Sequence, residues 1–220
     1  ISKKISVKEN MIPYNVRKHK GFLRFLVIKI GVHTNEVMVN LVTAGYKPDI
    51  IKPLVNALRD KIPSIKSIVN TINTRKSNIA SGTSKLIYGR EYINEKVGKY
   101  VFKISANSFF QTNPYQVKIL YDYIIKIANF KKNDIVYDLY CGTGTIGIYV
   151  ANLVKTVYGI EIVEDAIEDA KFNAKENNID NIQFYCGDLK DILDSKDMQD
   201  IEQPTTIIVD PPRPGLHSNT

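Results

Sequence analysis

The sequence predicts an α/β protein of two units, in which a small α+β domain precedes a doubly wound parallel sheet. Strand-like runs alternate with helical patterns through residues 105–220, and this alternation is typical of parallel sheets. The charge also changes sign along the chain. Residues 1–104 hold 20 Lys and Arg against 6 Asp and Glu (+14), whereas residues 105–220 hold 10 against 17 (−7), which together give the net +7. We therefore expect two domains, 1–104 and 105–220.

The first unit contains strand signals on both sides of one helix signal. Residues 22–31 and 37–45 are rich in β-branched residues and flank a short polar link, which indicates a β-hairpin. Residues 47–61 carry apolar side chains at helical spacing, with Pro53 in the first turns. Further strand-like pieces cover 65–72, 85–88 and 100–104. This order predicts the α+β domain.

The second unit opens with a helix over 115–129. The expected strands are 135–139, 156–160, 182–185 and 205–209. A strong helix is expected over 164–177, because its acidic first turn suits the helix macrodipole. The chain begins with Ile and ends one loop after the fourth expected strand. We therefore expect a fragment whose parallel sheet is incomplete at its C-terminus.

Composition limits the classes of protein to consider. With 44% hydrophobic and 24% charged residues the chain is an ordinary globular protein. It has no long apolar run and no signal-peptide core, so we expect a cytoplasmic protein without a membrane partner. Two cysteines and three histidines match no metal-ligand spacing, and we expect no metal. The basic first unit favours a nucleic-acid partner, since a mere lysine bias would have charged both halves alike.

The clearest motif is VYDLYCGTGTIG over 136–147. Gly142, Gly144 and Gly147 form G-x-G-x-x-G between a strand and a helix, which taken alone also fits a nicotinamide dehydrogenase. Asp138 precedes this turn and Glu161 ends the next strand. A carboxylate before the turn can meet a cationic methionine moiety, and one ending the second strand can accept both ribose hydroxyls. The pair predicts S-adenosylmethionine (SAM).

Two further sites follow strands at the same edge. Asp188, after the third strand, can accept the adenine amino group, although an N-cap of the following helix is the alternative. The fourth strand leads into Asp210-Pro211-Pro212-Arg213, where two prolines stiffen a ledge for a planar base. The Asp210 carboxylate suits a donor such as uracil N3–H, and a rigid loop with a salt bridge is the alternative reading.

Several motifs together resemble one family. SFFQTNPYQ, DLYCGTGTIG, GIEIVEDAIEDAKFNA and DPPRPGL are similar to the RNA uracil-C5 methyltransferases, which act on tRNA or 23S rRNA, and KGFLRFLVIKIG and PSIKSIVNTIN resemble that family's central domain. The resemblance implies a Rossmann-like SAM-methyltransferase domain. By position it implies cofactor binding by Gln111, Tyr140, Thr145, Glu161, Asp188 and Asp210, beside Asp138, Gly142 and Gly144. Thr145 stands where some members have Asn. Base positioning is expected from Gln111, Asp210, Pro211 and Arg213.

The resemblance also implies a mechanism and a partner. In this family a cysteine thiolate adds to uracil C6, C5 takes the methyl group, and a base removes the C5 proton. The family's nucleophilic Cys and base Glu follow the DPPR motif by a few tens of residues, so we expect no catalytic residue within this chain. Cys141 and Cys186 are expected to be small buried hydrophobes.

We expect rRNA or tRNA as the partner, and a monomer. Members of this family carry an N-terminal β-barrel, and some of them also carry an iron–sulfur cysteine cluster. Neither feature has a counterpart in these 220 residues. Two alternatives remain at this point. One is another SAM-dependent RNA base methyltransferase, which modifies an exocyclic amine, and the other is a non-catalytic RNA-binding module.

Overall fold

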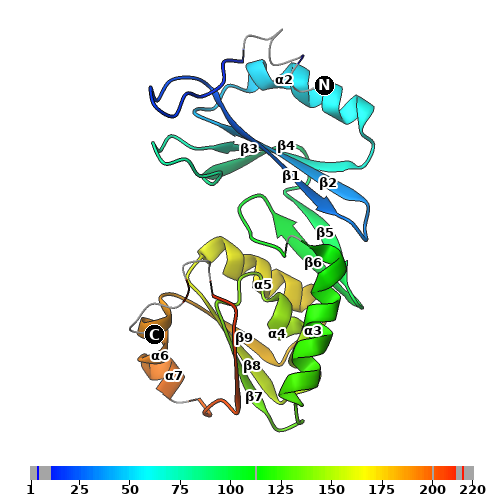
Figure 1. The fold of residues 1–220 in the computed structure, drawn as a ribbon, viewed down its shortest axis with the longest axis vertical. Coiled ribbons are helices and arrows are strands. Elements are labelled where there is room, and N and C mark those ends of the chain that lie inside the picture. The colour runs from blue at the N-terminus through cyan, green and yellow to red at the C-terminus, as the bar shows by residue number, and fades with distance from the viewer. Residues whose placement is uncertain (1–3, 5–10, 112, 200, 212–214, 216–220) are drawn as a thin grey trace. The chain divides into compact units, whose positions relative to one another are not determined.

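The computed structural model describes residues 4, 11–111, 113–199, 201–211 and 215. They divide between two compact units, which we describe separately: Ile1–Glu95 with Ile104–Asn107, and Lys96–Lys103 with Ser108–Thr220 (Figure 1). The elements that begin in the first unit are β1 (Leu23–Gly31), β2 (Glu36–Thr43), α2 (Pro48–Lys61), β3 (Ile65–Ile72), β4 (Thr83–Gly89) and β5 (Tyr92–Val97).

The first unit is a four-stranded sheet covered by one helix. The strand order is β1-β2-β3-β4, in which β1–β2 is the predicted antiparallel hairpin and β2–β3 are parallel across α2. The helix buries Ile51, Leu54 and Leu58 against the sheet because these apolar residues recur on one helical face. The predicted α+β architecture is confirmed.

The second unit is a parallel sheet with helices on both faces. It contains β6 (Tyr100–Ser105), α3 (Pro114–Ala128), β7 (Ile135–Leu139), α4 (Thr145–Ala151), β8 (Thr156–Glu161), α5 (Glu164–Glu176), β9 (Ile182–Cys186), α6 (Leu189–Leu193), α7 (Lys196–Gln199) and β10 (Thr206–Val209). The order β10-β7-β8-β9 is parallel throughout. Residues of α3, α4 and α5 join one hydrophobic cluster and residues of α6 and α7 another, as expected of a doubly wound sheet.

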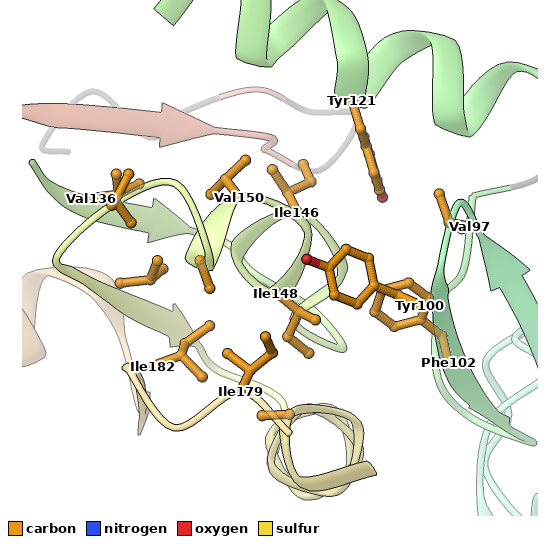
Figure 2. Packing of buried hydrophobic residues seen from close by; sticks show 14 of the residues in the cluster. Val97, Tyr100, Phe102, Tyr121, Val136, Ile146, Ile148, Val150, Ile179 and Ile182 are labelled. Carbon is orange, nitrogen blue, oxygen red and sulfur yellow. The ribbon is translucent and has the colours of Figure 1, made fainter. Parts of the chain in front are cut away.

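The strands β5 and β6 form a two-stranded sheet where the chain passes from one unit to the other. Tyr100 and Phe102 of β6 lie in the core cluster of the second unit with Tyr121 of α3 (Figure 2). The expected boundary between 104 and 105 therefore differs from the observed division, which assigns residues 96–103 to the second unit.

The structure adds one strand that the sequence pattern does not indicate. In β5, strand alternation places Glu95 on the same face as Ile93 and Val97, and all three side chains are buried although Glu95 is charged. Its carboxylate accepts hydrogen bonds from the backbone N–H groups of Val32 and His33, at 2.6 and 3.0 Å. A buried carboxylate satisfied by distant backbone cannot be recognised from local alternation.

No helix in the described part of the chain is long and apolar enough to cross a membrane.

Candidate active site

Three of the predicted site residues lie where parallel strands end, at the same edge of the sheet. Leu139 of β7 is paired with Ile160 of β8 and with Val209 of β10. Tyr140, Glu161 and Asp210 are therefore at the carboxyl ends of adjacent strands. This edge is where doubly wound folds bind ligands.

The glycine turn needs left-handed backbone. Tyr140, Gly142 and Gly144 have φ angles of 62°, 54° and 75°. A Cβ on Gly144 would lie 2.9 Å from a ring carbon of Phe184, so a larger residue would not fit. A Cβ on Gly142 would meet nothing within 4 Å. The turn is thus packed closely against Phe184 at Gly144 and borders open space at Gly142.

Asp138 carries a buried carboxylate with one unsatisfied oxygen. Its side chain is 1% exposed, and its Oδ2 accepts a hydrogen bond of 2.9 Å from the N–H of Gly147. The Oδ1 atom is buried without a partner. Burial raises the pKa of Asp138 to about 7, and the charges of Asp210 and Glu161 add to this effect. A cationic group at this position would offset both the burial of the Asp138 charge and its repulsion by Asp210 and Glu161.

Glu161 ties the glycine turn to the end of β8. One carboxylate oxygen accepts from the N–H of Gly142 at 3.1 Å, and the other accepts from the N–H of Val163 at 2.9 Å. A carboxylate has about four acceptor positions, so these bonds leave capacity for ligand hydroxyls. Its predicted role at the ribose stays a prediction.

Gln111 and Asp210 are brought together from opposite ends of the second unit. The Nε2 of Gln111 donates a hydrogen bond of 3.1 Å to the Oδ2 of Asp210. Pro211 follows Asp210 and is half-buried. Arg213, the remaining residue predicted to position the base, lies outside the described residues, as does Pro212.

The structure reveals a buried tyrosine at the glycine turn that the motif analysis does not include. The hydroxyl groups of Tyr121 and Thr145 are hydrogen-bonded at 2.7 Å, and the Tyr121 side chain is fully buried. Burial raises the pKa of Tyr121 above its usual range, and the nearby charges of Asp138 and Asp210 contribute. The apolar spacing of the helix indicates that Tyr121 is buried, but it does not reveal its partner.

Asn173 of α5 is a second residue absent from the motif analysis. Its Nδ2 donates to the carbonyl of Thr143 in the glycine turn at 3.0 Å, and its Oδ1 accepts from the N–H of Lys103 in β6 at 2.7 Å. The side chain is fully buried. Asn173 therefore links β6 to the glycine turn.

Asp188 is the N-cap of α6. Its Oδ1 accepts from the N–H of Lys190 at 3.0 Å, which is the structural alternative that the sequence leaves open. This bond does not conflict with the predicted contact to adenine, which stays a prediction.

The two cysteines differ in their surroundings. Cys141 is buried as expected, and burial raises the pKa of its thiol well above the usual value. The prediction that Cys186 is buried is wrong, because this last residue of β9 is exposed. Since β9 and β10 are opposite edges of the sheet, three strand spacings separate Cys186 from Asp210, roughly 14 Å.

The comparisons with known proteins agree with one another, because each of them finds RNA methyltransferases. The family model described as tRNA (uracil-5-)-methyltransferase matches residues 14–220. An uncharacterized RNA methyltransferase of Oceanobacillus iheyensis is 39% identical over 203 residues, and one of Halalkalibacterium halodurans is 42% identical over 203. Each alignment covers 92% of this chain and 44% of the relative, so the chain spans less than half of these relatives.

A solved structure agrees with these relatives. The Pyrococcus abyssi tRNA (uracil-54, C5)-methyltransferase, solved with S-adenosyl-L-homocysteine, is 33% identical with a TM-score of 0.79. The match covers 99% of this chain and 50% of that one.

Proposed function

Because the chain belongs to the tRNA (uracil-5-)-methyltransferase family, we propose that it binds SAM for methyl transfer to C5 of a uridine in RNA. The observation that carries this proposal is the buried Asp138 carboxylate, which has one unpartnered oxygen and precedes a left-handed glycine turn in the chain. The family model and the Pyrococcus abyssi enzyme favour tRNA over rRNA as the substrate. Family membership argues against the dehydrogenase alternative.

The residues at the sheet edge fit the chemistry of SAM. The Asp138 carboxylate suits the cationic methionine end, because its buried charge lacks a counter-ion. Glu161 suits the ribose hydroxyls, with the open face of Gly142 beside it. Asp188 is proposed to accept the adenine amino group. When bound, SAM supplies an electrophilic methyl group.

Gln111 and Asp210 are proposed to hold the uracil ring. The Asp210 carboxylate can accept the uracil N3–H, and Gln111 can fix that carboxylate through the hydrogen bond between them. Pro211 is proposed to support the base from below, and the positioning role of Arg213, which lies outside the described residues, stays a prediction. A target base within structured RNA would first have to leave its stack, which costs a few kcal/mol.

Neither cysteine in the chain suits nucleophilic attack on uracil C6. Cys141 is buried and its raised pKa keeps it a thiol, whereas the reactive form is the thiolate. Cys186 lies at the edge of the sheet opposite Asp210. We therefore propose that the nucleophile of the C6 adduct is not among these 220 residues. Location in the cytoplasm and a monomeric state likewise stay predictions.

Calorimetry tests the cofactor assignment. The chain should bind S-adenosylhomocysteine and not NAD, and Glu161→Ala should weaken binding by a few kcal/mol, about 1.5 to 3 per lost bond to the carboxylate. Glu168→Gln removes one charge from an exposed position on α5 and is the matched control. Unchanged affinity in Glu161→Ala would reject the ribose assignment.

A further inference from the structure

Two basic loops in the first unit form one ordered surface. We propose that this surface, made of residues 15–20 and 74–80 and called here the paired basic loops, binds the phosphate backbone of the RNA. The proposal rests on the proposed function and adds where the RNA is held. It concerns contacts within the first unit only.

Arg24 of β1 fixes the second loop. Its Nη1 donates to the carbonyls of Asn73 and Arg75, at 2.9 and 2.5 Å, and its Nη2 donates to the carbonyl of Ser77 at 2.6 Å. The buried side chain of Asn73 adds two bonds, because its Nδ2 donates to the Ile79 carbonyl and its Oδ1 accepts from the Arg75 N–H. The Nη1 and Nη2 groups of Arg24 thus hold the loop backbone, and the exposed cations of the loop remain available to a ligand.

Tyr14 joins the first loop to the same arginine. The guanidinium carbon of Arg24 lies 4.3 Å from the centroid of the Tyr14 ring. The turn that follows is closed by Asn15, whose N–H donates to the Lys20 carbonyl at 2.7 Å and whose Oδ1 accepts from the Lys18 N–H at 2.9 Å. Both loops leave the sheet on the same side (Figure 1).

The charge of this surface has one sign. The exposed cations of the paired basic loops are Arg17, Lys18, Lys20, Arg75 and Lys76. Neither residues 10–35 nor residues 61–90 contain any Asp or Glu. On α2, by contrast, Arg59 is paired with Asp60. Closely spaced cations on an ordered backbone match the phosphates of RNA and lose little entropy on binding.

Fluorescence anisotropy with a labelled tRNA transcript tests the location. The double variant Arg75→Gln/Lys76→Gln should weaken binding and lower the slope of log affinity against log salt by about 0.7 to 0.9 per lost phosphate contact. The matched control is Lys52→Gln/Lys61→Gln, which removes two charges from exposed positions on α2. The control should bind RNA with the parent's slope.

A third variant, Arg24→Ala, should weaken RNA binding and speed amide hydrogen exchange at 74–80. If Arg24→Ala fails to fold, the Arg75→Gln/Lys76→Gln variant and its control on α2 still test the proposal. If the loop variant and the α2 control lose the same RNA affinity, the paired basic loops are not the binding surface, although the chain still binds RNA. If the parent chain does not bind RNA but binds S-adenosylhomocysteine in the same preparation, the surface proposal falls and the cofactor assignment survives.

Discussion

The Asp138 carboxylate makes cofactor affinity depend on pH. Because burial raises its pKa to about 7, the free protein holds a proton there more tightly than an unfolded chain. The stability from this group is therefore present at low pH and is lost as the pH rises through about 7. A cationic ligand group instead favours the ionised carboxylate. Affinity for S-adenosylhomocysteine should thus increase as the pH rises from 6 to about 7.5, measured by calorimetry.

The control for this prediction is Asp138→Asn. The amide oxygen can still accept from the Gly147 N–H, so the turn keeps this hydrogen bond. The variant should bind more weakly than the parent above pH 7, and its affinity should not follow the same titration. A pH dependence that survives in Asp138→Asn would assign it to another group.

Asn173 should matter for the cofactor more than its neighbour Asn177. In Asn173→Asp the side chain still accepts from the Lys103 N–H but cannot donate to the buried Thr143 carbonyl, an unsatisfied group that costs about 1 to 3 kcal/mol. Asn177 bonds the N–H and carbonyl of Val101 and makes no described contact with the glycine turn.

We therefore expect Asn173→Asp to lower affinity for S-adenosylhomocysteine roughly tenfold, about 1.4 kcal/mol. Asn177→Ala should lower the melting temperature and leave affinity unchanged. Calorimetry beside thermal unfolding separates the two effects, and parallel losses of affinity would show that general destabilisation explains both.

The helix α3 has one buried face and one exposed apolar face. Val117 is 2% exposed, whereas Ile119 and Ile127 are 59% and 63% exposed. Changing both isoleucines to lysine should alter the free energy of unfolding by at most about 0.5 kcal/mol per site and reduce aggregation. Val117→Ala removes two buried methyl groups and should cost about 2 kcal/mol. Urea unfolding and light scattering measure these effects, and a large stability loss in the lysine variant would show that this face is packed.

The 220-residue chain should bind SAM without methylating uridine. Its buried thiol and its distant exposed thiol leave uracil C6 without a nucleophile. Incubation of these 220 residues with labelled SAM and uridine-containing RNA should give no methyl transfer. Transfer that is observed and then lost in Cys141→Ala would make Cys141 catalytic.

Local sequence pattern is enough to predict the α/β class and most elements of the chain. The strand predicted over 135–139 has the bounds that the structure gives to β7, and the helix predicted over 164–177 differs from α5 by one residue. These elements are readable because hydrophobic periodicity and helix-end signals act over a few residues. The glycine turn and its flanking carboxylates were equally visible, since their spacing follows from the strand–turn–helix order.

Which polar groups meet cannot be predicted from local pattern, because it depends on long-range packing. Glu95, Tyr121 and Asn173 bond to partners between 24 and 70 residues away, within a core whose low polarity makes each missing bond costly. The exposure of Cys186 has the same origin, because a strand's last residue is covered only if another segment packs there. Local pattern fixes the elements of this chain, and long-range packing fixes the partners of its buried polar side chains.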